Sequence, residues 1–356
     1  MTITRPPYRR ILITRLRFIG DVVLTTPIIR SVRAAFPGAY IAYLGEKNAV
    51  SLLEHNPCLD EIIPFDPSRS ALFEQARVML LLRRRKFDLA IDLFGNPRSA
   101  LLTYASRAAT RVGLQRRGRG RLYTVQVADD GAPKTALAFH NQFLAAAGIV
   151  PTESRTEIVV TEQEREEACR WLARGTGVEI DAGDQGPLVG IHPGATWPAK
   201  KWLPERFAEL SDAIVSKLGG RVVVTAGPQD SGTVAEVLRQ TRAKVNVLTA
   251  LPLRTLAAVI AQCSVYVSND AAPMHIAAAV GTPVIGLFGP GEENIWFPYP
   301  RAGGHAALRR DVPCHPCHLD RCNREGEEYM ECMKLLRVEE VLSAVETSLQ
   351  RKPSSL

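Results

Sequence analysis

The stretch that most constrains the fold is SVYVSNDAAPMHIAAAVGTPVIGLFGP, from Ser264 to Pro290. It predicts a short strand, a helix that begins after Asp270 and ends at Gly281, and a second buried strand. Pro273 suits the first turn of this helix, where a missing N–H costs nothing. Strand–helix–strand units of this kind form parallel sheets, which bind ligands at the carboxyl ends of their strands. The helix N-terminus favours an anion there, although an ordinary capped unit would have the same pattern.

The same alternation extends along the whole chain and predicts its fold class. Its 356 residues are about twice the usual single-domain length, so two domains are expected. We predict an α/β protein with two Rossmann-like doubly wound domains facing a central cleft. The expected segments are a first domain at 1–175 with a polar strand edge at 157–160, a linker at 176–187, and a second domain at 188–356 with a Cys-rich loop at 314–332 and a C-terminal helix that packs back on the first domain.

Charge is divided unevenly between the two halves. The chain carries +7 overall, but residues 1–150 contain 22 Lys and Arg against 11 Asp and Glu. Seven arginines and no acid lie between Arg98 and Arg121. Such a field attracts phosphates or an anionic lipid surface. The alternative is a solvated basic face with no specific partner. Nucleic acid is disfavoured because few aromatic residues lie among the arginines. No apolar run reaches the ~18 residues of a membrane helix and no leader pattern is present, so we expect a cytosolic protein.

Polar residues that follow predicted strands are the candidate site residues. Asp21 lies at the first strand–helix loop and could cap the helix or act as a general base. Asp230, after Gly227-Pro228, could hold a ribose hydroxyl or cap a helix. His275, one turn into the helix after Asp270, is either a structural histidine or a phosphate contact.

The stretch HPGATWPAKKW, from His192 to Trp202, offers a different set of groups. Backbone N–H groups, the Thr196 hydroxyl and the Lys200 ammonium could bind a diphosphate. The spacing is not that of a P-loop, and a surface loop with exposed lysines is the alternative.

Four cysteines near the C-terminus form the last candidate. Cys314, Cys317, Cys322 and Cys332 could hold zinc, but the paired CxxC pattern is missing and free thiols are the favoured interpretation.

Taken together, these motifs resemble the bacterial lipopolysaccharide heptosyltransferases of glycosyltransferase family 9. The resemblance rests on the stretches GDVVLTTP, DLFGNPRSALL, HPGATWPAKKW and SNDAAPMHIAAAVGTPVIGLFGP, and on the Cys-rich tail before RVEEVL. It implies a GT-B fold with the acceptor on the N-terminal domain and the nucleotide-sugar on the C-terminal domain. It also implies inverting, metal-independent transfer of heptose from ADP-heptose to the inner core attached to lipid A, at the cytoplasmic face of the inner membrane, with no cofactor.

The resemblance also assigns roles to residues. Asp21 matches the catalytic carboxylate, and inversion requires a base opposite the leaving group. The donor residues it implies are Thr196, Lys200, Asp230, Asp270, Ala271, Ala272 and His275. Arg98 and His140 are expected on the acceptor side.

Two departures concern the donor pocket. Ala271-Ala272 stand where the family usually has Ser or Thr followed by Gly, so a hydroxyl to the phosphate is lost. The stretch Leu248–Leu251 lacks the Gly and Lys of the family's LTGK-like motif. The alternatives are a sugar-nucleotide epimerase of the same fold and a non-catalytic nucleotide- or glycan-binding protein. An oxidoreductase is disfavoured because no GxGxxG follows a strand.

Overall fold

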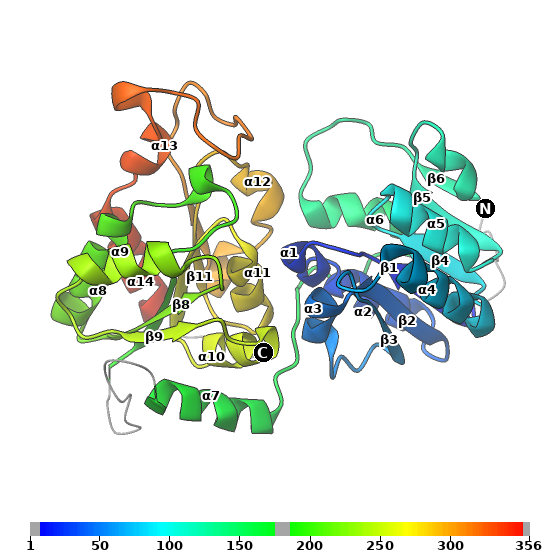
Figure 1. Ribbon diagram of the computed structural model, residues 1–356, viewed down its shortest axis with the longest axis horizontal. Helices are drawn as coiled ribbons and strands as arrows, with labels where there is room; N and C mark the ends of the chain where they lie inside the picture. The colour runs from blue at the N-terminus through cyan, green and yellow to red at the C-terminus, as the bar shows by residue number, and fades with distance from the viewer. Residues whose placement is uncertain (1–7, 175–185, 352–356) are drawn as a thin grey trace. The chain divides into compact units, whose positions relative to one another are not determined.

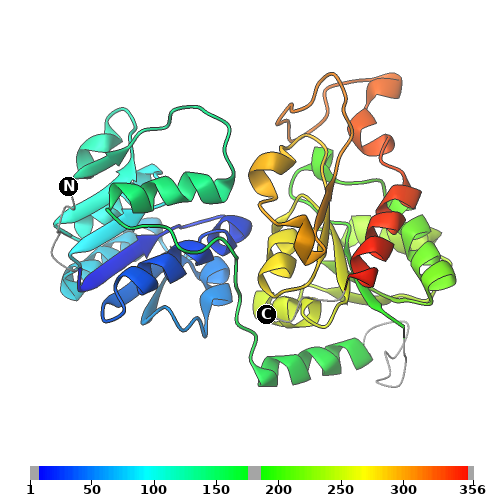
Figure 2. The same ribbon diagram turned by 180° about the vertical axis from the view of Figure 1, so that it is seen from behind.

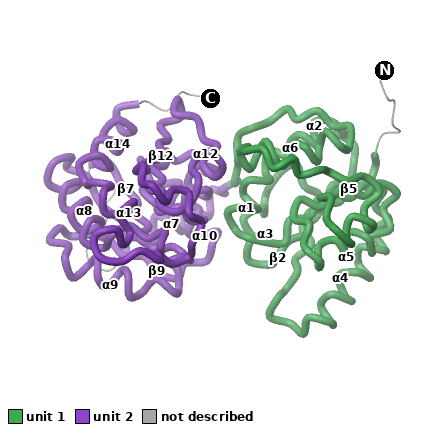
Figure 3. The backbone as a smooth tube through the Cα atoms, turned by 90° about the horizontal axis from the view of Figure 1, so that it is seen from above, with its two compact units in different colours: residues 1–159 green, residues 160–356 purple. Residues whose placement is uncertain are grey.

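The computed structural model describes residues 8–174 and 186–351, and the chain divides into two compact units, residues 1–159 and 160–356 (Figure 3). Each unit is built on its own sheet of six parallel strands. Helices cover both faces of each sheet (Figure 1). The strands are therefore buried on both sides and are almost continuously hydrophobic, as parallel strands generally are.

Unit 1 has the strand order β3-β2-β1-β4-β5-β6. Its elements are β1 (Arg10–Thr14), α1 (Ile19–Val23), α2 (Thr26–Ala35), β2 (Tyr40–Glu46), α3 (Lys47–Val50), β3 (Glu61–Phe65), α4 (Ala71–Arg85), β4 (Leu89–Asp92), α5 (Pro97–Ala105), β5 (Thr110–Leu114), β6 (Val125–Val127) and α6 (Ala136–Ala146), with short 3-10 turns at Ser51–Leu53 and Arg119–Leu122.

The helices of unit 1 form two layers around the sheet. Helices α4 and α5 cover one face, and α2 and α6 cover the other (Figure 1, Figure 3). Val78, Leu82 and Leu102 fill the α4–α5 layer, while Ile28 and Phe143 belong to the opposite core. The outward side of α4 and α5 is therefore a separate surface of the unit.

Unit 2 has the strand order β12-β11-β10-β7-β8-β9. Its elements are α7 (Glu162–Arg174), β7 (Leu188–His192), the 3-10 turn η3 (Pro198–Lys200), α8 (Pro204–Leu218), β8 (Arg221–Ala226), α9 (Ser231–Gln240), β9 (Asn246–Thr249), α10 (Leu253–Ile260), β10 (Val265–Asn269), α11 (Ala272–Ala279), β11 (Val284–Leu287), α12 (Glu293–Trp296), β12 (Ala306–Leu308), α13 (Glu331–Lys334) and α14 (Val338–Gln350), with short 3-10 turns at Arg301–Gly303 and Gly326–Glu328. The C-terminal helix α14 packs beside α8 within this unit (Figure 2).

Helix α7 belongs to unit 2, so the boundary between the units precedes the expected position at residue 175. The helix packs on α10. Arg254 donates two hydrogen bonds to the Glu164 carboxylate, at 2.7 and 2.5 Å, and Asn246 Nδ2 donates to the Leu172 carbonyl at 2.6 Å. Burial raises the pKa of Glu164, but the hydrogen bonds from Arg254 and Thr161 outweigh it and hold that pKa at about 2. Most of the expected linker, 176–187, lies outside the described residues.

Two other expectations about secondary structure were wrong. Residues 157–160 form no strand, because the backbone N–H of Glu157 binds the Thr26 hydroxyl at 3.0 Å instead of a neighbouring strand. No strand was predicted in the arginine-rich segment after residue 107, yet it contains β5 and β6. Arg111 fits into a strand because its guanidinium binds the carbonyls of Ala108 and Leu122, at 2.6 and 2.9 Å.

Both sheets have the same topology, which creates one topological switch point in each unit. The chain moves outward from β1 to β3, then crosses to the other side of β1 and continues with β4; β7, β9 and β10 repeat this course. The crossing makes a topological switch point, which is where open α/β sheets bind ligands. It lies between β1 and β4 in unit 1 and between β7 and β10 in unit 2. Across the described residues, no helix is both long and apolar enough to span a membrane.

Candidate active site

The carboxyl end of the β1–β4 pair, here called the β1/β4 edge, carries Asp21 and Arg15. Arg15 follows β1, and Asp21 lies in the first turns of α1. The Asp21 Oδ1 atom is 2.5 Å from Arg15 Nη2, and Oδ2 accepts a hydrogen bond from the Phe18 N–H at 3.2 Å. The side chain of Asp21 is 13% exposed. The Asp21 carboxylate therefore caps the start of α1, as one of the two interpretations of the sequence predicted. It is also oriented by the Arg15 guanidinium, and it remains accessible to solvent.

Arg15 is fixed by the neighbouring strand end. Its Nη1 atom donates to the Leu93 carbonyl at 2.7 Å, and its guanidinium lies 4.7 Å from the centre of the Phe94 ring. Because these contacts come from the segment after β4, the position of Asp21 depends on two neighbouring strands.

Arg98 is presented at the same edge by a turn that is built on buried Asp92. Burial raises the pKa of Asp92. Its Oδ1 atom accepts the N–H groups of Phe94 and Gly95, at 3.0 and 3.1 Å, and its Oδ2 atom accepts the Tyr123 hydroxyl at 2.6 Å. The turn leads directly into α5, whose second residue is Arg98. Arg98 is half-buried, with its guanidinium 5.1 Å from the Phe65 ring centre.

His140 has a different environment from the one expected of an acceptor contact. It lies on α6 and is buried. Desolvation, assisted by the positive charge of Arg15, lowers its pKa to about 3. A buried neutral imidazole is not placed to contact a ligand, so we assign His140 to the packing beneath this edge.

The carboxyl end of the β7–β10 pair, here called the β7/β10 edge, carries Lys200 and Asp270. Lys200 Nζ is 2.5 Å from Asp270 Oδ2 and 4.8 Å from the centre of the Trp197 ring. Asp270 itself is nearly fully buried. The loop after β11 approaches this pair so closely that a Cβ added to Gly291 would lie 2.7 Å from Asp270 Oδ2. The loop therefore closes tightly over the ion pair, and a side chain at position 291 would require the Asp270 carboxylate to shift.

Asn269, which was not among the candidate site residues, joins the two strand ends. Its Nδ2 atom donates to the carbonyls of Pro193 and Gly194, at 2.9 and 3.3 Å. Its Oδ1 atom accepts the Trp202 N–H at 3.0 Å. The side chain thereby connects the ends of β10 and β7 to the segment that carries Lys200. In the sequence, only its position directly before Asp270 in the SND stretch could have indicated this role of Asn269.

Asp230 occupies the neighbouring strand end, after β8. It stands at the N-cap position of α9 but accepts no capping hydrogen bond from that helix; its Oδ2 atom accepts the Gly227 N–H at 3.2 Å instead. Lys201 Nζ lies 3.4 Å from Oδ1. A Cβ added to Gly194 would lie 2.2 Å from Oδ2, so the carboxylate lies directly against the HPG turn. Desolvation lowers the pKa of nearby His192 to about 4, although Asp230 opposes the shift.

The remaining donor-side candidates differ in their exposure. Thr196 is exposed in the loop between β7 and η3. Ala271 is the N-cap residue of α11, Ala272 is the first helical residue, and both are partly exposed. They leave N–H groups at the helix start with no side-chain hydroxyl. His275 is buried, with Nδ1 2.6 Å from the Tyr299 hydroxyl, as a structural histidine would be.

The Cys-rich segment contacts the loop that closes over Asp270. His315 Nε2 donates to the Gly291 carbonyl at 3.0 Å, and the His318 N–H donates to the Pro290 carbonyl at 3.1 Å. The Ala199 N–H, next to Lys200, donates to the Asp320 carbonyl at 3.0 Å. This positioning function of the segment was missed in the sequence, where only the thiols drew attention.

The four thiols of the segment have no metal-binding arrangement. Within residues 8–174 and 186–351, no group of three or more His, Cys, Asp or Glu side chains could hold a metal ion. Burial, and then the nearby Cys314, Cys317 and Cys322, raise the pKa of Cys332 to about 11. The zinc alternative therefore finds no support among the described residues.

Comparison with known proteins agrees with the resemblance to glycosyltransferase family 9. Residues 76–326 match the model of glycosyltransferase family 9 (heptosyltransferase). Lipopolysaccharide heptosyltransferase 2 of Salmonella typhimurium is 27% identical over 305 residues, covering 81% of this chain and 85% of that protein. The crystal structure of a family 9 glycosyltransferase from Veillonella parvula superposes with a TM-score of 0.83 at 27% identity, covering 97% and 98% of the two chains. The E. coli heptosyltransferase WaaC with ADP-2-deoxy-2-fluoro heptose shares the fold, with a TM-score of 0.69 at 20% identity over 95% and 99% of the chains.

The two Rossmann-like units have the GT-B-like fold of the solved family 9 glycosyltransferase. The chain belongs to glycosyltransferase family 9. It is therefore an enzyme of group transfer, and the epimerase and binding-protein alternatives are set aside.

Proposed function

We propose that this enzyme transfers heptose from ADP-heptose to the inner core of lipopolysaccharide, with inversion at the anomeric carbon and without a catalytic metal. The observation that carries the proposal is that each unit places one cation–carboxylate pair at its switch point, Arg15–Asp21 and Lys200–Asp270. Transfer needs a base for the acceptor and a cation for the leaving diphosphate, and the two pairs supply them. The family and the heptosyltransferase relatives support heptose as the transferred sugar.

Asp21 acts as the general base on the acceptor. Its carboxylate takes the proton of the acceptor hydroxyl, and the hydroxyl oxygen attacks the anomeric carbon from the face opposite the diphosphate. The new C–O bond forms as the bond to the phosphate oxygen breaks, and ADP departs with the electron pair. Arg15 and the Phe18 N–H hold the carboxylate in one orientation, which limits its motion during the proton transfer.

The β7/β10 edge binds the donor and stabilises the departing ADP. Lys200 contacts the diphosphate, where its ammonium offsets the charge that develops on the leaving oxygen. The N–H groups of Ala271 and Ala272 and the Thr196 hydroxyl add further donors. Asp270 holds sugar hydroxyls and Asp230 holds the ribose, each kept in place by a lysine at 2.5 and 3.4 Å. His275 supports this helix from within the core.

The acceptor is anionic and lipid-borne, and unit 1 has the charge to bind it. Arg98 lies at the same switch point as Asp21, and no carboxylate among the described residues forms an ion pair with it. We assign it to an acid group of the acceptor. We further propose that the enzyme works at the cytoplasmic face of the inner membrane, in peripheral contact with its anionic surface.

The decisive experiment measures heptose transfer from ADP-heptose to a heptose-deficient core, with EDTA present, for the wild type and Asp21→Asn. Wild-type transfer in EDTA with a loss of about 100-fold or more in the variant supports both the base and metal independence. Transfer that is undiminished in Asp21→Asn would overturn the mechanism. Transfer that EDTA abolishes would overturn metal independence.

A further inference from the structure

The outward side of α4 exposes apolar side chains that a water-soluble helix normally turns inward. Leu72, Phe73 and Leu80 are 84%, 64% and 54% exposed. Exposed positions recur along the helix at Phe73, Ala76, Leu80 and the Arg83–Arg84 pair, which follows the helical repeat. The stripe thus begins apolar near β3 and ends basic at the opposite end of the helix.

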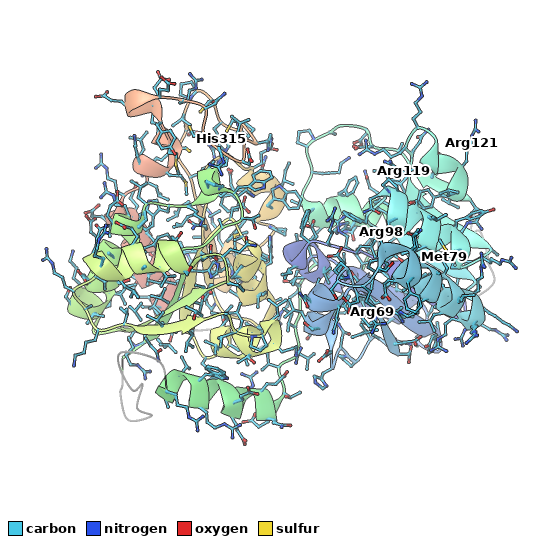
Figure 4. All side chains as sticks on the ribbon, in the orientation of Figure 1. Arg69, Met79, Arg98, Arg119, Arg121 and His315 are labelled. Carbon is cyan, nitrogen blue, oxygen red and sulfur yellow. The ribbon has the colours of Figure 1, made fainter. Side chains whose placement is uncertain are left out.

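The neighbouring helix α5 continues this surface. Leu101 and Tyr104 are 38% and 51% exposed, and α5 packs directly against α4. Five of the twelve exposed large hydrophobic side chains among the described residues therefore lie on two adjacent helices of 15 and 9 residues. Figure 4 labels Met79 of α4 and Arg98 of α5, which mark where the two helices lie in unit 1.

The charge of this surface is of one sign. The only acidic residue from Arg69 to Lys86 is Glu74, which is fully buried and hydrogen-bonded to Arg77 at 2.6 and 2.7 Å. No Asp or Glu occurs from residue 93 to 128. Exposed arginines border the apolar side chains at Arg83, Arg84 and Arg107.

We propose that the exposed side of α4 and α5, here called the α4–α5 face, docks the enzyme on an anionic lipid bilayer. Apolar side chains surrounded by arginines, without acids, match the interfacial zone of such a bilayer. Leucine and phenylalanine enter the boundary of the acyl chains while arginines contact the phosphates of the head groups. A protein partner would need an acidic rim and also a complementary apolar contact for each of the five exposed side chains. A bilayer accepts these side chains in any arrangement.

The face also borders the proposed acceptor site. Helices α4 and α5 both begin at the carboxyl end of the sheet, after β3 and β4, so Leu72, Phe73 and Arg98 lie toward that edge (Figure 1). A bilayer on this face would present a lipid-anchored acceptor beside the edge that carries Asp21. The inference rests on the proposed function in that it names the surface for the membrane contact proposed above, but docking itself does not depend on which sugar is transferred.

The test is sedimentation of the full-length enzyme with vesicles that contain phosphatidylglycerol and with vesicles of pure phosphatidylcholine. We expect binding to the anionic vesicles only, weakened by added salt because screening reduces the attraction of arginines to the surface. Arg83→Glu/Arg84→Glu should lower the partition coefficient by about tenfold or more, and Leu72→Ser/Phe73→Ser by a similar factor. Matched controls are Val150→Ser, 75% exposed outside the face, and Arg170→Glu on exposed α7, both with unchanged binding.

Three results would overturn the proposal. The first is that the face variants and the controls bind vesicles equally. The second is that the enzyme binds duplex DNA but not anionic vesicles. The third is that Leu72→Ser/Phe73→Ser changes the oligomeric state without changing vesicle binding. Transfer to a deacylated, water-soluble acceptor separates this inference from the proposed function. The face variants should retain that activity, whereas an enzyme that binds vesicles but transfers to no acceptor would leave docking intact and refute heptose transfer.

Discussion

The two switch points of this protein share one topology but differ in how their charged pairs are buried. At the β1/β4 edge Asp21 and Arg15 are almost equally exposed, at 13% and 12%, and the Arg15 guanidinium is fixed by the Leu93 carbonyl. At the β7/β10 edge Asp270 is more deeply buried and Lys200 is the more exposed partner, with side-chain exposures of 6% and 20%. Burial thus distinguishes the two partners only at the β7/β10 edge, where Lys200 is the more accessible one. The comparison teaches that the shared topology places a charged pair at each switch point, while the local packing decides how deeply each partner lies.

Asp21→Asn should have the largest effect, because it removes the base but keeps the shape of the side chain. We expect kcat to fall by about 100- to 10,000-fold, the range for general-base catalysis, while the affinity for ADP stays within a factor of two. Steady-state transfer kinetics and ADP titration calorimetry measure the two quantities. A comparable loss of ADP affinity would show that the two edges do not have separate tasks.

Lys200→Ala should have the next largest effect, and on the other substrate. Loss of a charge-assisted contact to the diphosphate should weaken ADP binding by about 10- to 100-fold. The matched control is Lys217→Ala, at an exposed position of α8, with unchanged binding. If Lys200→Ala binds ADP as tightly as the wild type, Lys200 serves only to hold Asp270.

Two of the buried histidines, one in each unit, predict that both units lose stability in mild acid. Desolvation lowers the pKa of His140 to about 3 in unit 1 and that of His192 to about 4 in unit 2. In the unfolded chain each histidine has a pKa near 6.5, so below that pH it binds a proton that the buried imidazole of the native state does not. Stability is therefore complete above pH 6.5 and falls by about 1.4 kcal/mol per pH unit for each histidine as the pH drops toward 4.

The units can be monitored separately in this experiment. All four tryptophans, Trp171, Trp197, Trp202 and Trp296, lie in unit 2, so their fluorescence reports its unfolding. Hydrogen exchange of peptides from residues 8–159 reports unit 1. His140→Leu should flatten the pH dependence of unit 1 and leave the fluorescence transition unchanged. An equal effect on both signals would show that the units unfold together.

His315→Ala should have the smallest effect. The lost hydrogen bond to the Gly291 carbonyl loosens the loop over Asp270, and we expect KM for the donor to rise by about 2- to 10-fold with little change in kcat. His315→Gln, which can still donate, should recover part of the loss. His318→Ala is the matched control, because its contact with Glu292 at 3.3 Å is exposed and contributes little. A large fall in kcat for His315→Ala would give this residue a role beyond positioning.

Much of the fold could be predicted because local patterns agree with it. The buried strands β1, β2, β4, β8, β10 and β11 are hydrophobic runs bounded by turn residues, and helices such as α8 carry Pro and Gly at their ends. The strands β5 and β6 were missed because arginines interrupt the run, and only the neighbouring carbonyls make Arg111 compatible with a strand. The unit boundary was misplaced because the contacts of α7 with Asn246 and Arg254 join residues more than 70 positions apart.

The sequence by itself determined the class of sheet, the order of its polar anchors and the residue types at each strand end. It predicted Asp21, Lys200, Asp230 and Asp270 as candidate site residues, because they follow buried strands at the edge where parallel sheets bind ligands. Only the tertiary structure decided which of them are paired, that Asn269 and His315 hold their frame, and that His140 is buried beneath one edge rather than displayed on it. The physical reason is that pairing and burial depend on distances between segments far apart in the chain, and a one-dimensional pattern does not contain these distances.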